Sequence, residues 1–142
     1  MRLLIFLLTL SFLFACSQAP KTNTNSNTNL AEKNKQTALR NDLVRLVQEA
    51  QKLEQEGRTL DIYRTMPSAA NTEACLKAVG ERSVRLEDFQ KKSESLPDNY
   101  KTKLLTIFPD LDKCISCEKT ALENCKKARA AINEAIKEFF PQ

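Results

Sequence analysis

Five cysteines and the complete absence of histidine limit the chemistry open to this chain. Without histidine there is no Ser-His-Asp or Cys-His catalysis, and no imidazole ligand for a metal or haem. Cys114 and Cys117 have the C-x-x-C spacing of redox motifs and of half a zinc site. Glu118 follows them, which excludes the C-x-x-C-H motif of haem attachment. Cys75 and Cys125 are the other two cysteines that lie far from the N-terminus.

The N-terminus has the features of an exported protein. Arg2 supplies a basic start, and residues 3–14 (LLIFLLTLSFLF) form an uncharged apolar run of 12 residues. A membrane-spanning helix needs about 20 apolar residues, whereas a signal peptide needs a basic start and a run of roughly 7–15. Ala15 and Cys16 follow the run, so a small residue precedes a cysteine at the expected cleavage site.

Residues 13–16 (LFAC) resemble the lipobox of bacterial lipoproteins. The resemblance implies that Cys16 carries a covalent lipid, that residues 1–15 are removed, and that the mature protein is anchored in the cell envelope. Phe14 departs from the family pattern, which usually has a smaller residue there, and an ordinary signal peptide with an incidental cysteine is the alternative. Ser17, which is not aspartate, implies the outer membrane as the destination in Gram-negative lipoproteins.

Composition divides the mature chain into a linker and a domain. Residues 17–29 read SQAPKTNTNSNTN, a low-complexity polar tract without side chains to bury. We therefore expect residues 16–30 to contain the lipidated cysteine and a disordered linker. Residues 31–142 change to a helical pattern and are long enough for one small domain.

The helical pattern predicts an all-α fold, a small disulfide-braced bundle of three to four helices. No stretch alternates apolar and polar residues as a strand would, and the chain has only 2 glycines. The first helix ends at Gly57, a residue type favoured just after a helix. We expect its apolar stripe to pack on the chain's own core, with a dimerising coiled coil as the alternative. The stripe consists of Leu39, Leu43, Leu46, Ala50 and Leu53.

The other helices are predicted from caps, prolines and apolar spacing. They cover residues 68–95, 98–108 and 112–139, and the connection over 58–67 contains a single helical turn. Pro97 and Pro109 end the second and third of the four helices, because the residue before a proline is pushed out of the helical region. Gly80 lies inside a helix at a cost of about 1 kcal/mol relative to alanine, so we expect a close packing contact there.

Four cysteines in an exported domain predict two disulfides. If the last helix is continuous, Cys114 and Cys125 lie about 16 Å apart along it at 1.5 Å per residue. Disulfides require Cα atoms within about 7 Å, so the preferred pairing is Cys75–Cys125 with Cys114–Cys117. The alternative, Cys75–Cys117 with Cys114–Cys125, requires a break in the helix near residues 116–119.

The carboxylate pairs and the two C-terminal aromatic residues have structural explanations. Glu54 and Glu56 form one of several carboxylate pairs, which we interpret as a solvated helix face and not as a catalytic pair. Phe139 and Phe140 are adjacent and cannot both face one core, so we expect either a frayed C-terminus or one exposed aromatic side chain.

The nearly balanced charge and the absence of histidine favour a non-enzymatic binding module. Removal of Arg2 with the signal lowers the 22 basic side chains to 21 against 18 acidic ones, a balance of +3 that gives no case for nucleic-acid binding. We expect the lipid bilayer and an envelope protein as partners, no small-molecule substrate, and no cofactor beyond the lipid on Cys16. Secretion or transport accessory, inhibitor or immunity protein, and exclusion factor all fit. The alternative is a thiol-disulfide or metal-handling protein that uses Cys114 and Cys117.

Overall fold

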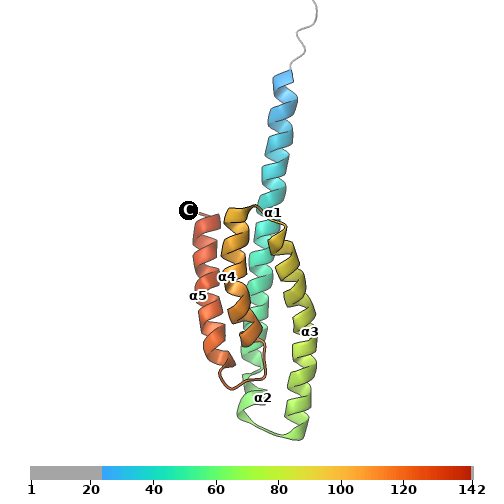
Figure 1. Cartoon of the computed structure of the whole chain (residues 1–142), viewed down its shortest axis with the longest axis vertical. Coiled ribbons are helices and arrows are strands. Elements are labelled where there is room, and N and C mark those ends of the chain that lie inside the picture. The colour runs from blue at the N-terminus through green and yellow to red at the C-terminus, as the bar shows by residue number, and fades with distance from the viewer. Residues whose placement is uncertain (1–23, 142) are drawn as a thin grey trace, which may run out of the picture. The chain divides into compact units, whose positions relative to one another are not determined.

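The computed structural model describes residues 24–141, with side chains from Asn29 onward. Its contacts divide the chain into two units, Met1–Lys35 and Gln36–Gln142, and the bundle described here is the second unit. The described residues contain no strand, which confirms the all-α prediction (Figure 1). The elements in order are α1 (Thr24–Thr59), α2 (Asp61–Thr65), α3 (Ala69–Glu94), α4 (Asp98–Cys114) and α5 (Ala121–Phe139).

Within the second unit the long helices run alternately up and down, with α2 between the end of α1 and the start of α3 (Figure 1). Short connections favour this antiparallel arrangement of neighbouring helices. The single helical turn predicted for residues 58–67 is confirmed as α2, whose residues pack against α3.

The apolar stripe of α1 packs in the core of its own chain, as predicted. Leu39 lies partly buried at the edge of this core. The helix differs from the prediction at both ends, since it begins at Thr24 instead of Ala31 and continues through Gly57 to Thr59. Extending an existing helix is far easier than nucleating one, so polar residues can be added at its N-terminus. The buried residues of the stripe are Leu43, Leu46, Val47, Ala50 and Leu53.

The predicted bounds of α3 are confirmed. Ser68 is its N-cap, and the Ser68 hydroxyl accepts a hydrogen bond from Asn71 N at 3.1 Å. The helix ends before Pro97, as expected from the restriction that proline places on its predecessor. Its core contribution is concentrated toward its C-terminal end, where Leu86 and Phe89 are buried.

The prediction that Pro109 closes a short third helix is wrong. The helix α4 passes through Pro109 and ends at Cys114. Its buried side chains continue on one face at helical spacing beyond the proline, and Pro109 itself is exposed. The burial of Leu111 and Cys114 therefore offsets the cost of a proline in the helix interior.

The C-terminal aromatic residues are both half-buried against the core, so the expectation of an exposed ring is wrong. Phe139 contacts Tyr100 of α4 with ring centroids 5.3 Å apart in an edge-to-face arrangement. Phe140 contacts Phe139 in the same way at 6.3 Å. Edge-to-face aromatic pairs of this kind add to the stabilisation that comes from burying apolar surface.

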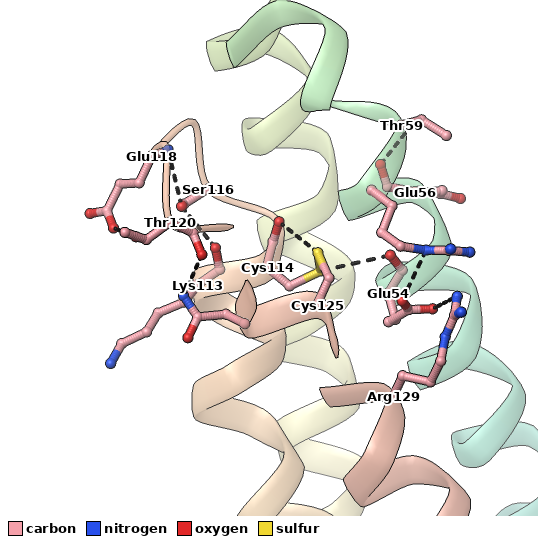
Figure 2. The surroundings of a disulfide bond; sticks show 12 residues. Glu54, Glu56, Thr59, Lys113, Cys114, Ser116, Glu118, Thr120, Cys125 and Arg129 are labelled. Atoms are coloured by element: carbon pink, nitrogen blue, oxygen red, sulfur yellow. Dashed lines mark hydrogen bonds and ion pairs between the residues drawn. A yellow bond between two sulfur atoms is a disulfide. The ribbon is translucent and has the colours of Figure 1, made fainter. Parts of the chain in front are cut away.

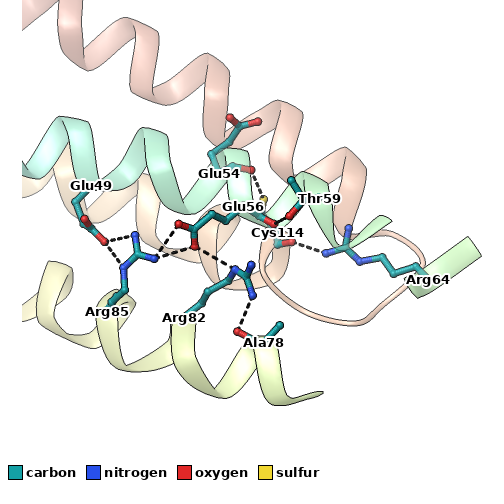
Figure 3. A network of polar contacts seen from close by, with 9 residues as sticks. All are labelled: Glu49, Glu54, Glu56, Thr59, Arg64, Ala78, Arg82, Arg85 and Cys114. Carbon is teal, nitrogen blue, oxygen red and sulfur yellow. Dashed lines mark hydrogen bonds and ion pairs between the residues drawn. The ribbon is translucent and has the colours of Figure 1, made fainter. Parts of the chain in front are cut away.

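An ion-pair network fastens α3 to α1 (Figure 3). Arg85 pairs with Glu49 at 2.7 Å and with Glu56 at 2.8 Å, and Arg82 pairs with Glu56 at 3.2 Å. Burial alone would lower the pKa of Arg85, but hydrogen bonds and charge from Glu49 and Glu56 outweigh it and raise that pKa. Charged side chains therefore help to hold the middle of α3 to α1.

Candidate functional site

Two disulfides brace the end of the bundle where α4 meets α5. One joins Cys75 of α3 to Cys117, with Cα atoms 6.1 Å apart, and the other joins Cys114 to Cys125, with Cα atoms 4.6 Å apart (Figure 2). The preferred pairing of Cys75 with Cys125 and Cys114 with Cys117 is wrong, and the alternative pairing is the one found.

A break between α4 and α5 explains the observed cysteine pairing. Residues 115–120 are not helical, whereas one helix over 112–139 was predicted. The break turns the chain, so that Cys125 packs back against Cys114 and Cys117 reaches α3. Asp110 and Asp112, which a helix over 112–139 would place at its N-terminal end, lie in the last turns of α4.

Arg64 fixes the end of α4 from α2. Its Nη2 donates hydrogen bonds to Cys114 O at 2.8 Å and Ser116 O at 2.6 Å, and its Nε donates to Ser116 O at 3.0 Å. These carbonyls belong to a helix C-terminus, which lacks intrahelical partners and carries the negative end of the helix dipole. Arg64 is buried, and desolvation lowers its pKa. The interaction positions the loop that carries Cys117.

The sulfurs of the second disulfide are packed against backbone. Cys114 Sγ lies 3.7 Å from Glu54 O, and Cys125 Sγ lies 3.5 Å from Cys114 O (Figure 2). A bonded sulfur has no hydrogen to donate, so these are packing contacts. Cys114 and Cys125 are fully buried, whereas Cys117 is half-buried. Cys114 and Cys117 belong to different disulfides and do not form the C-x-x-C bond of a redox site.

Gly57 allows α1 to approach this disulfide. A Cβ at Gly57 would overlap Cys114 Sγ and would lie 2.9 Å from Cys114 O. At Gly80, where we expected such an approach, no atom lies within 4 Å of the corresponding position. The prediction of close packing at Gly80 is therefore wrong, and Gly57 is the glycine that α4 requires.

Glu54 and Glu56 point to different neighbours and do not form a catalytic pair. Glu54 is buried, in contrast to the solvated face we predicted, and pairs with Arg58 of α1 and Arg129 of α5, each at 3.0 Å. Glu56 pairs with α3 through Arg82 and Arg85. Both carboxylates tie helices together, and Glu54 is the one that links α1 to α5.

The surface near the disulfides carries exposed apolar side chains. Ile62 of α2, Met66 at its C-cap and Leu76 of α3 are 57%, 63% and 61% exposed. The α2–α3 end is defined here as these three residues and the turn that joins them. Among the described residues, Leu30 and Val84 are the other large apolar side chains with high exposure. Exposed apolar side chains that form a contiguous patch often serve a contact with another molecule.

Over residues 24–141 no group of three or more histidine, cysteine or acidic side chains is placed to hold a metal ion. Of the helices in that range, none is both long and apolar enough to cross a bilayer. The predicted lipidation site, Cys16, lies outside the described residues. Comparison of the chain with protein-family models, curated proteins and solved structures found no match.

Proposed function

We propose that this chain is the precursor of a lipid-anchored bacterial envelope protein whose helical domain binds a partner protein and carries out no catalysis. The anchor is supported by the apolar segment 3–14 and by Cys16 at its end. Several acyl chains on one N-terminus hold a protein at a bilayer far more firmly than a single chain does. Ser17 after the lipidated cysteine favours the outer membrane as the final location.

The exposed apolar side chains of the α2–α3 end support the binding role. Ile62, Met66 and Leu76 lie on a segment that is fastened by the Cys75–Cys117 disulfide and by Arg64. A surface that is rigid before binding loses less conformational freedom when its partner arrives. Methionine adapts readily to the shape of an apolar partner surface. We expect the partner to be an envelope protein with a complementary apolar patch. Such a partner suits this chain in the role of an accessory, inhibitor, immunity or exclusion protein.

Site-specific photo-crosslinking in intact cells tests the binding role. A photoreactive amino acid at Met66 or Leu76 is expected to give a discrete protein adduct, and one at Lys127, an exposed residue of α5, is expected to give none. Adding Ile62→Glu to the Met66 probe should remove the adduct, because burying a charge against an apolar patch is unfavourable. Equal adducts from all positions, or an adduct that survives Ile62→Glu, would reject this surface.

Cell fractionation tests the anchor separately. The native chain is expected in the membrane fraction after alkaline or high-salt washing, and Cys16→Ser should release it or leave the signal uncleaved. If Cys16→Ser is still processed and remains bound to membranes after washing, the anchor is not a lipid on that cysteine. This outcome would leave the crosslinking result unaffected.

A thiol-disulfide function is the competing proposal, and it makes different demands on the cysteines. It requires Cys114 or Cys117 to be accessible as a thiolate. The burial of Cys114 and its bond to Cys125 instead support a bracing role. Alkylation of these two cysteines in protein extracted without reduction would favour the thiol function.

A further inference from the structure

A shallow pocket of about 290 Å³ opens between α1 and α5. Gln51, Gln55 and Arg58 line it from α1, and Arg129 and Asn133 line it from α5. On each helix these residues are three or four positions apart, so they form facing polar stripes. Three of them carry neutral amides and two carry guanidinium groups, so the rim is rich in hydrogen-bond donors.

The only acidic side chain that lines the pocket is already engaged. The Glu54 side chain is 5% exposed, and one of its oxygens lies 3.0 Å from Arg58 Nε. The other lies 3.0 Å from Arg129 Nη2 (Figure 2). Two positive charges therefore surround one negative charge, which leaves the pocket with an excess of one positive charge. Burial of Glu54 also fixes the two arginines beside each other across the gap between the helices.

The arginines keep N–H donors that Glu54 does not occupy. The side chains of Arg58 and Arg129 remain 39% and 47% exposed. Among the described residues, neither guanidinium has another hydrogen bond or ion pair. Each guanidinium has five N–H donors in a planar fork that matches the oxygens of a carboxylate or phosphate group. Two such forks beside three amide groups make a receptor for a tetrahedral oxyanion.

We propose that this pocket binds a phosphate-type oxyanion, either as a small soluble phosphate or as the headgroup of an anionic phospholipid. Arg58 and Arg129 donate to the oxygens and supply the charge, while the amides of Gln51, Gln55 and Asn133 complete the donor set. Ile132, which is buried, closes the pocket on the α5 side. The site does not depend on the lipid at Cys16 or on the partner of the α2–α3 end.

Titration of the detergent-solubilised full chain with inorganic phosphate, followed by amide NMR at constant ionic strength, tests the site. Saturable shifts are expected in residues 51–58 and 129–133. Arg58→Gln and Arg129→Gln should each weaken binding about tenfold, because each removes a charge-assisted hydrogen bond. Lys127→Gln removes an exposed positive charge of α5 outside the pocket and should change the affinity less than about twofold. Unsaturable shifts, or equal losses in all three variants, would overturn the proposal.

The Glu54→Gln variant tests whether the pocket binds an oxyanion or a cation. This variant keeps both arginines and removes the negative charge, so phosphate should bind at least as tightly as in the native chain. Phosphate binding that disappears in Glu54→Gln, while thermal unfolding shows the variant to be folded, would contradict the proposed charge arrangement.

The source of the phosphate is resolved with nanodiscs. The chain is compared in discs of phosphatidylcholine alone and in discs that also contain phosphatidylglycerol. Shifts at the same amides that require phosphatidylglycerol, and that Arg129→Gln removes, assign the pocket to a lipid headgroup. Saturable binding of free phosphate without such shifts assigns it to a soluble phosphate, and both results uphold the oxyanion site.

Discussion

Arg64 is the residue on which the disulfide-braced end depends most directly. Its guanidinium satisfies two backbone carbonyls, Cys114 O and Ser116 O, at a helix terminus where no backbone donor is available. A buried acceptor that loses its partner costs about 1–3 kcal/mol, more than the net gain from forming an ordinary hydrogen bond. The sequence contains no motif that identifies Arg64, because its partners are 50 and 52 residues away along the chain.

Replacing Arg64 by methionine is expected to lower the free energy of unfolding by about 2–3 kcal/mol, since both carbonyls are left without a donor. Arg40→Met is the matched control, because Arg40 is exposed on α1 and its loss should change stability by less than about 0.5 kcal/mol. Urea unfolding of the oxidised proteins measures both. Equal effects in the two variants would mean that Arg64 does not hold the end of α4.

The two glycines provide a second test at the residue scale. Gly57→Ala places a Cβ against Cys114 Sγ, and the resulting overpacking should destabilise the protein by about 1–3 kcal/mol. Gly80→Ala meets open space inside α3 and should stabilise the protein by up to about 1 kcal/mol, because alanine favours a helix. Thermal unfolding should therefore move in opposite directions. A stabilising Gly57→Ala would show that α1 and α4 are not packed as closely as described.

Local signals predicted the ends of α3 correctly but failed at Gly57 in α1 and at Pro109 in α4. Ser68 and Pro97 delimit α3 correctly because capping and proline restriction act over a few residues. Pro109 misled the prediction because tertiary burial of Leu111 and Cys114 outweighs a local cost. Once α4 was ended too early, its last turn was joined to α5, and the cysteine pairing derived from that continuous helix failed.

The N-terminal half of α3 should be the least stable part of the helix. Cys75 is the one buried residue of this half, so the Cys75–Cys117 disulfide holds it, while the ion pairs of Arg82 and Arg85 lie beyond it in the middle of the helix. The Cys75–Cys117 bond spans 42 residues, and the chain-entropy model gives its contribution as about 4 kcal/mol.

Cys75→Ala with Cys117→Ala is expected to speed amide hydrogen exchange over residues 61–80 and 115–120, while α4 and α5 remain protected. The core cluster that contains the buried side chains of α1, α4 and α5 includes neither Cys75 nor Cys117. Cys114→Ala with Cys125→Ala is the comparison, since it should loosen the contact between α4 and α5 instead. Uniform loss of protection across all helices in the first variant would show that the Cys75–Cys117 bond does not act mainly on the N-terminal part of α3.

For the whole molecule, the composition and the helical spacing of the apolar residues were enough to predict the all-α class. The single apolar face of each helix was enough to predict a bundle. The link from α1 to α5 through Glu54 was not predictable, because a lone glutamate next to polar residues is normally solvated. The same link creates the proposed oxyanion pocket. Sequence patterns reveal which faces are apolar, but they do not show which polar side chains are trapped between helices.

Mass spectrometry of peptides from membrane-extracted protein, alkylated without prior reduction, tests the lipid anchor and the disulfide brace in one experiment. An anchored, disulfide-braced binding module should carry acyl chains on Cys16 and intact Cys75–Cys117 and Cys114–Cys125 bonds, and it should have no alkylated cysteine. An unmodified Cys16 would contradict the anchor. A Cys114–Cys117 bond, or alkylation of either residue, would contradict the brace and favour a thiol function.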